Sequence, residues 1–157
     1  VVKTEFNIEG YPDHRYRTLI AEIKPAQATL VPDPPTAITS NAGWDTQQHQ
    51  SFLREVVAEF KSYGVRVSVF VDANTKMVEA AAQTGADRIE LYTEPYAKIY
   101  GTDAQRAVAD YVSCAALAHQ LGLGVNAGHD LDLHNLKFLK QQLPHLHEVS
   151  IGHALVC

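Results

Sequence analysis

The chain has 157 residues, of which 46% are hydrophobic and 20% charged, with a formal net charge of −5 at pH 7. This length suits one domain over residues 1–157, and a net negative charge without a lysine or arginine stripe argues against a nucleic-acid partner. The two cysteines, Cys114 and Cys157, form neither a disulfide framework nor a metal-binding spacing, and no apolar stretch approaches the ~18 residues of a membrane span. We therefore expect a cytoplasmic protein.

Short runs of apolar and β-branched residues recur along the chain and predict six strands. They lie at residues 2–9, 28–31, 65–71, 88–92, 123–126 and 148–151. The runs at 28–31 and 65–71 are almost continuously apolar, which is expected where both faces of a sheet are covered.

Amphipathic patterns between these runs predict helices. Their first residues follow Asp13, Asp45, Asn74 or Thr75, and Thr102, whose side chains can accept hydrogen bonds from free helical N–H groups. The predicted helix ends are Gly64, Gly85 and Gly122, because glycine readily adopts the left-handed conformation that closes a helix.

Strands that alternate with helices of this length indicate an α/β fold with a parallel sheet. Two architectures fit the six strands. A (β/α)8 TIM barrel would lack about two βα units, because a complete barrel needs roughly 250 residues. An open doubly wound sheet could be complete with six.

Chemically active side chains stand at the ends of four predicted strands. Glu9 and Glu90 end two early strands, and the pairs Gly128-His129 and Gly152-His153 follow two later ones. If these ends share one rim, they bring together acid, base and anion-binding groups, which is typical of an enzyme. Glycine backbone amides could hold a phosphate there despite the negative net charge.

Seven segments in the same order are similar to those of one family. They include Phe-Asn-Ile-Glu9-Gly-Tyr-Pro, Arg88-Ile-Glu-Leu-Tyr-Thr and Val125-Asn-Ala-Gly-His-Asp-Leu, and the others lie at 24–33, 38–40, 67–73 and 150–154. In these segments the chain resembles the pyridoxine 5′-phosphate synthases of vitamin B6 biosynthesis. The resemblance covers nearly all residues and implies an incomplete TIM barrel, with strands three to eight but without the first two βα units and the last helix.

The resemblance also implies a reaction. It is the condensation of 1-deoxy-D-xylulose 5-phosphate with 3-amino-2-oxopropyl phosphate to pyridoxine 5′-phosphate, phosphate and water, with no metal or organic cofactor. By the same resemblance, Glu9 is a general acid/base, His129 a proton donor and Glu90 a group that stabilises the transition state.

Binding residues are implied in the same way. Thr39 would contact the sugar phosphate, while Gly152, His153 and the backbone at Asp130 would hold the aminoketone phosphate. The family often has glycine where this chain has Asp130. The implied partners are phosphorylated small molecules and further copies of the chain, because the family forms octamers, and neither nucleic acid nor membrane is implied.

Other interpretations stay open at this stage. The chain could be a truncated barrel that binds phosphorylated ligands or partners without turnover, or another phosphate-binding isomerase or aldolase. The second of these would need a Schiff-base lysine or a metal, and no lysine ends a strand after Lys3.

Several residues also have structural alternatives. Glu9 and Glu90 could form salt bridges with neighbours such as Lys3 or Arg88. His145 and His147 could suggest zinc, although a solvated loop fits them better. Tyr96 and Tyr100 are predicted in a surface loop, where a lid is conceivable.

Overall fold

Six parallel strands form one curved sheet in the computed structural model, which describes residues 3–33 and 40–152. The strands are β1 (Asn7–Gly10), β2 (Gln27–Leu30), β3 (Arg66–Val71), β4 (Arg88–Tyr92), β5 (Gly124–Gly128) and β6 (Leu146–Ser150). Each strand pairs with the next along the chain, in the order β1-β2-β3-β4-β5-β6. A doubly wound sheet reverses its strand order, so this unbroken order is that of a barrel.

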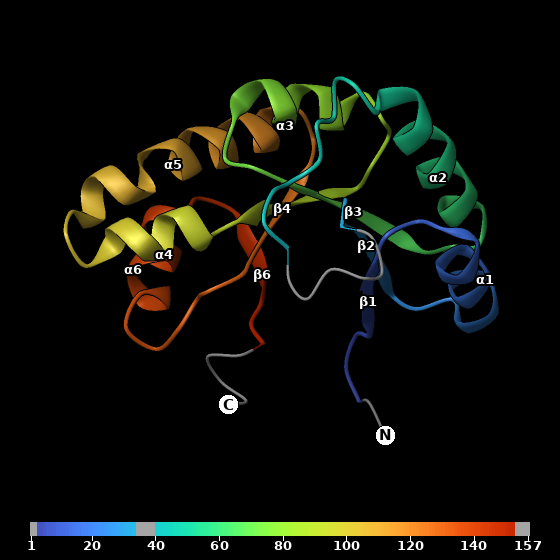
Figure 1. Cartoon of the computed structure of the whole chain (residues 1–157), viewed down its shortest axis with the longest axis horizontal. Coiled ribbons are helices and arrows are strands. Elements are labelled where there is room, and N and C mark those ends of the chain that lie inside the picture. The colour runs from blue at the N-terminus through green and yellow to red at the C-terminus, as the bar shows by residue number, and fades with distance from the viewer. Residues whose placement is uncertain (1–2, 34–39, 153–157) are drawn as a thin grey trace.

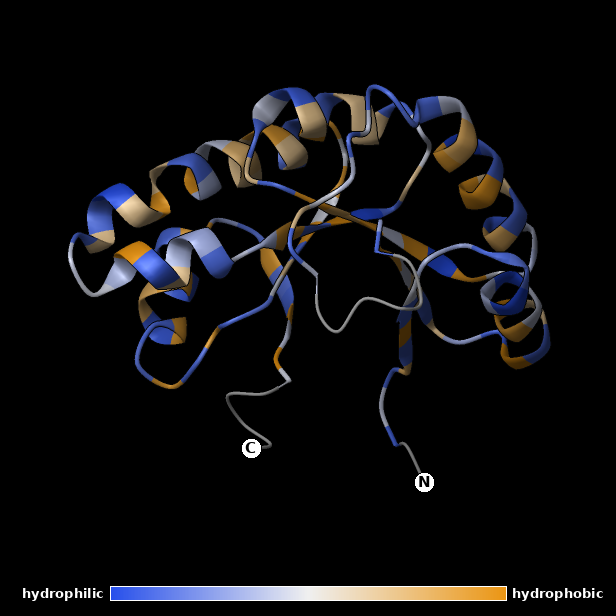
Figure 2. Cartoon of the chain, viewed as in Figure 1, coloured by the Kyte–Doolittle hydropathy of each residue, from blue (hydrophilic) through white to orange (hydrophobic). Residues whose placement is uncertain are grey.

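In the described part of the chain, the helices lie on the convex side of the arched sheet (Figure 1). They are α1 (His14–Ile23), α2 (Gln50–Ser62), α3 (Thr75–Ala82), α4 (Glu94–Tyr100), α5 (Ala104–Gln120) and α6 (Leu136–Gln142). Their apolar sides face the sheet (Figure 2). The structure is thus a half-barrel, which confirms the predicted incomplete TIM barrel over the doubly wound alternative.

The two faces of the strands differ in polarity. In β3, Val67, Val69 and Val71 belong to the core beneath the helices, whereas Ser68 and Phe70 point to the concave side. The expectation that both faces of this strand are covered is confirmed, because every residue from Val67 to Val71 is buried, but polar side chains such as Ser68 and Glu90 lie on the concave face. The sheet therefore presents a polar inner surface on which reactive side chains can gather.

The predicted helix starts are partly confirmed. Asp13 and Asn74 accept hydrogen bonds from the backbone N–H groups of Tyr16 and Lys76, at 2.8 and 2.9 Å. Asp45 was wrong as a helix start, because it accepts from Gln48 N in a turn and α2 begins at Gln50. Asp103, one residue after the predicted Thr102, caps α5.

The helix ends agree with the sequence. Gly64, Gly85 and Gly122 adopt φ values of 81°, 82° and 79°. No helix in the described parts of the chain is long and apolar enough to cross a membrane.

Tyr96 and Tyr100 do not lie in a surface loop. Both belong to α4, and Tyr96 is fully buried with its hydroxyl donating to the carbonyl of Asn135 at 2.7 Å. A lid role for Tyr96 is excluded by this burial, because its ring is part of the core between α4, α5 and the loop before α6.

Candidate active site

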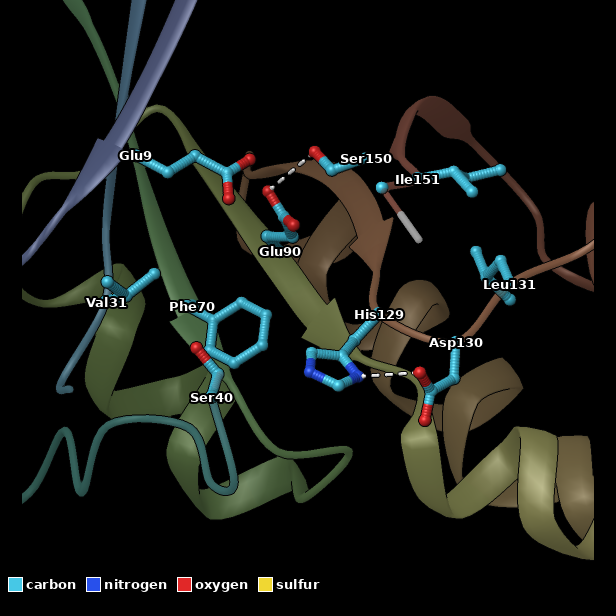
Figure 3. A pocket seen from close by; sticks show the side chains of 11 residues that line it. Glu9, Val31, Ser40, Phe70, Glu90, His129, Asp130, Leu131, Ser150 and Ile151 are labelled. Carbon is cyan, nitrogen blue, oxygen red and sulfur yellow. Dashed lines mark hydrogen bonds and ion pairs between the residues drawn. The ribbon is translucent and has the colours of Figure 1, made fainter. Parts of the chain in front are cut away.

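A pocket of about 440 Å³ opens on the concave side at the carboxyl ends of the strands (Figure 3). Five of the residues expected from the sequence line it: Glu9, Glu90, His129, Asp130 and Gly152. They come from β1, β4 and the segments after β5 and β6, so these strand ends do share one rim. Thr39 and His153 lie outside the described residues.

Glu90 is the most deeply placed ionisable group of the pocket. Its side chain is only 1% exposed, and Oε2 accepts a long hydrogen bond of 3.4 Å from Ser150 Oγ. Burial raises the pKa of Glu90 well above the usual value, and the charge of Glu9 adds to this effect. Glu90 is therefore a carboxyl group that binds a proton readily.

Glu9 lies at the open side of the pocket and reaches solvent, but the pocket walls shield it from much of the surrounding water. This desolvation raises the pKa of Glu9, and hydrogen bonds from Ser150 and Asn7 partly oppose the rise. Asn7 Nδ2 donates to Glu9 Oε1 at 3.1 Å. A carboxyl group with a raised pKa that still reaches solvent suits proton exchange with a bound molecule.

The nearby arginines are bound elsewhere. Arg88 Nη1 contacts Glu148 Oε2 at 2.9 Å and Asn126 Oδ1 at 3.1 Å, and Arg66 pairs with Glu5. Within residues 3–33 and 40–152, neither Glu9 nor Glu90 forms an ion pair with Lys3, Arg88 or another cation. The salt-bridge interpretation of the two glutamates was therefore wrong.

His129 follows β5 on a tightly held backbone. It has a φ of 85°, and Thr93 Oγ1 donates to the carbonyl of Gly128 at 2.6 Å. Its ring packs edge-on against Tyr92, with centroids 5.0 Å apart, and its Nδ1 lies 3.3 Å from Asp130 Oδ1. These contacts fix an imidazole at the pocket wall, with a carboxylate beside it.

Asp130 occupies a left-handed position with φ 55°. This conformation explains why glycine suits the position, and aspartate is among the few other residues that tolerate it. The carbonyl of Asp130 accepts from Asn135 Nδ2 at 3.1 Å, and its half-exposed carboxylate contacts His129. That contact turns the negative charge towards the imidazole.

Sequence reasoning missed part of the pocket. Ser40, Phe70 and Ser150 also line it. Ser150 pairs in register with Gly128 across β5 and β6, so the alternation of inward residues along β6 could have identified it.

His145 and His147 make contacts other than metal ligation. Of the described residues, no three His, Cys, Asp or Glu side chains gather as metal ligands. His147 belongs to β6 instead of a loop and accepts from Val125 N at 3.2 Å, while His145 stacks on His119 with ring centroids 3.6 Å apart.

Comparison with known proteins extends these findings. The family model described as "Pyridoxal phosphate biosynthesis protein PdxJ" matches residues 1–157. The pyridoxine 5′-phosphate synthase of Cytophaga hutchinsonii is 60% identical over 157 residues, which are 100% of this chain and 66% of the relative. That of Christiangramia forsetii is 56% identical over 156 residues, 99% of this chain and 66% of the relative. The chain thus spans about two thirds of the length of these curated relatives.

A solved structure supports the fold alone. The tryptophan synthase A-subunit from Pyrococcus furiosus aligns with a TM-score of 0.60 and 17% identity, over 98% of this chain and 58% of that chain.

The strand order, the outer helices and a pocket at the carboxyl strand ends define a protein of the TIM-barrel class. Within that class, the match over all 157 residues is decisive, and the chain belongs to the PdxJ family of pyridoxal phosphate biosynthesis proteins. The family predicted from seven sequence segments is thereby confirmed.

Proposed function

We propose that this chain supplies the reaction pocket of a pyridoxine 5′-phosphate synthase. The reaction condenses 1-deoxy-D-xylulose 5-phosphate with 3-amino-2-oxopropyl phosphate and releases pyridoxine 5′-phosphate, phosphate and water. The observation that carries the proposal is the meeting of two carboxyl groups and an imidazole, from three separate strand ends, in one pocket. The synthase names of relatives at 60% and 56% identity support it.

Ring closure from an amine and a ketone requires repeated proton transfers, because water is lost and the intermediates tautomerise. Glu9 acts as the general acid/base, since its carboxyl group is shielded and yet reachable from the open side. His129 donates a proton from the opposite wall, and Glu90 stabilises charge that develops between them. No step calls for a metal or an organic cofactor.

The backbone segments after β5 and β6 bind the phosphate. Among residues 3–33 and 40–152, a Cβ added to Gly152 would have no atom within 4 Å, so this exposed backbone leaves room for an anion. Backbone N–H groups there and at Asp130 provide the attraction, with Thr39 and His153 as further contacts. Barrels often bind phosphate after their seventh and eighth strands, and β5 and β6 correspond to these strands in the family.

The cellular location and the oligomeric state belong to the same proposal. A biosynthetic reaction on phosphorylated metabolites and a buried thiol at Cys114 fit the cytoplasm, and assembly into an octamer follows the family resemblance. No contact in the pocket favours the alternative in which the chain binds ligands without turnover. The experiment must still test this alternative, because none of the described helices covers the concave side of the sheet.

The test uses two proteins: the 157-residue chain, and the same chain extended by the parts of the Cytophaga hutchinsonii relative outside the match. Formation of pyridoxine 5′-phosphate is followed for each. In the extended protein, His129→Asn should lower turnover by roughly 100-fold, the scale of a lost proton donor. His134→Asn is the matched control, because His134 is exposed in the same loop. Equal turnover of the two variants would remove His129 from the mechanism, and an inactive extended protein that still binds both phosphates would favour the non-catalytic alternative.

Gly152→Val tests the phosphate site separately. Because a Cβ added there meets no atom of the described residues within 4 Å, the fold should persist while binding of the aminoketone phosphate weakens by tenfold or more, about 1.4 kcal/mol. Calorimetric titration measures it, and wild-type affinity would place the phosphate elsewhere.

A further inference from the structure

Glu9 and Glu90 form a pair of carboxyl groups without a counter-charge. Their side chains point towards one another across the pocket (Figure 3). In the described parts of the chain, neither carboxyl group forms an ion pair. Glu90 is buried against β5, because its Oε1 occupies the space beside Gly128, which has no side chain.

The charged groups around the pair do not compensate it. Arg88 and Arg66 are directed towards Glu148 and Glu5, on the side of the amino ends of the strands. Glu148 adds a further negative charge that acts on both members of the pair.

Two other ionisable side chains complete these surroundings. The hydroxyl of Tyr16 donates to the carbonyls of Ile8 and Thr29 at 2.7 and 3.1 Å, and burial raises the pKa of Tyr16, so this side chain is a neutral phenol that offers no counter-charge. His129 stands on the far wall of the pocket, next to Asp130.

Ser150 is the residue that joins the two carboxyl groups. Its hydroxyl donates to Glu90 Oε2 at 3.4 Å, and the presence of this hydroxyl also lowers the pKa of Glu9. Ser150 ends β6, directly opposite Gly128, so its position is fixed by strand register.

We propose that Glu9 and Glu90 share a single proton at neutral pH, held mainly by Glu90, and that Ser150 is the positioning residue that maintains this pair. Two adjacent carboxylates in a partly enclosed pocket repel each other, and retaining one proton removes that repulsion. The proton resides on Glu90 because its carboxyl group is buried, whereas Glu9 meets solvent and keeps the charge. The pair then offers one proton donor and one acceptor side by side.

This inference does not depend on the proposed function, because the proton can be observed without a substrate. The side-chain carboxyl carbons of glutamate are labelled with ¹³C and titrated by NMR, in the 157-residue chain and in the extended protein. Glu9→Gln and Glu90→Gln assign the two signals. Removing the charge of Glu9 should let Glu90 ionise about one pH unit lower or more, which is the signature of coupling.

Ser150→Ala should raise the titration of the pair by about half a pH unit or more, since a hydrogen bond to the charged forms is lost. Ser150→Thr keeps the hydroxyl and should return the titration to that of the wild type. Ser68→Ala is the control, because Ser68 is a serine on the same concave face and, of the groups the structure describes, its buried hydroxyl has no hydrogen-bond partner.

Three results would overturn the proposal. The first is a Glu90 that is fully ionised at neutral pH in the wild type. The second is a Glu90 titration that Glu9→Gln leaves unchanged, which would show that the two groups share nothing. The third is a Ser150→Ala titration no different from that of Ser68→Ala, which would remove the positioning role of Ser150.

Discussion

Gly128→Ala tests how closely β5 approaches the buried carboxyl group of Glu90. A Cβ at residue 128 would lie 2.1 Å from Glu90 Oε1, 3.2 Å from Glu90 Cδ and 3.3 Å from Ser150 Cβ. Because Gly128 is not among the glycines with positive φ, the effect comes from contact and not from backbone strain.

The expected cost follows from two opposing terms. Forcing an extra methyl group into a filled site costs roughly 1–3 kcal/mol, since the carboxyl group or the strand must move. Replacing glycine by alanine also restricts the unfolded chain and returns about 0.4–1 kcal/mol. We therefore expect the free energy of unfolding to fall by about 1–2 kcal/mol, which lowers the melting temperature by roughly 2–4 °C per kcal/mol.

Urea unfolding of the 157-residue chain measures this change, and Gly101→Ala is the control. Gly101 has φ −68°, and an added Cβ there meets no atom of the described residues within 4 Å, so only the stabilising term remains. In the double variant Glu90→Ala/Gly128→Ala the clash is absent, so its cost should be smaller than the sum of the single costs by about 1 kcal/mol. If Gly128→Ala unfolds like Gly101→Ala, or if the two costs simply add, the contact between β5 and Glu90 is not as close as described.

Two further predictions concern buried polar groups. The raised pKa of Glu90 means that the folded state holds its proton while the unfolded state loses it above the ordinary value of 4.5, so stability should fall as pH rises from there towards the pKa of the folded state. In urea unfolding, Glu90→Gln should show a weaker dependence of stability on pH and should be more stable than the wild type at neutral pH. If the variant keeps the pH dependence of the wild type, this prediction is contradicted. Tyr96→Phe should cost about 1–2 kcal/mol in thermal unfolding, because the Asn135 carbonyl loses a buried donor, while Tyr100→Phe should cost less since its bond is exposed; equal costs would count against the buried bond.

Much of the fold could be predicted from the chain because its local signals agree. The strand at Arg88–Tyr92 was predicted to the residue, and the other strands were displaced by a few residues at their ends, where pairing with neighbours decides the length. Three glycine helix ends and the caps at Asp13 and Asn74 involve single residues with strong local preferences, so their sequence signals were reliable.

The misses have tertiary causes. α4 is short, and Tyr96 is buried only because α5 and the loop before α6 close around it, which no local pattern reveals. Asp45 carries the side chain of a helix cap, but Trp44 is fixed between β2 and β3 by hydrogen bonds to Leu30 and Phe70, so the chain makes a turn before α2 can begin.

The candidate site shows the same division. Residues at strand ends, such as Glu9 and His129, could be found because parallel strands bring their carboxyl ends together. The ion-pair partners of the arginines could not be predicted from the sequence, because only the sheet register decides that Arg88 pairs with Glu148 and not with Glu90.

The register also explains how one sheet combines stability with reactivity. Towards the amino ends of the strands, Arg66 and Arg88 are neutralised by Glu5 and Glu148, so that layer is paired and contributes to the fold. Towards the carboxyl ends, Glu9 and Glu90 are left without such partners among the described residues, and burial makes the ionisation of Glu90 costly. Because both layers lie on the same strands, the sheet register keeps the paired arginines apart from the two carboxyl groups that line the pocket.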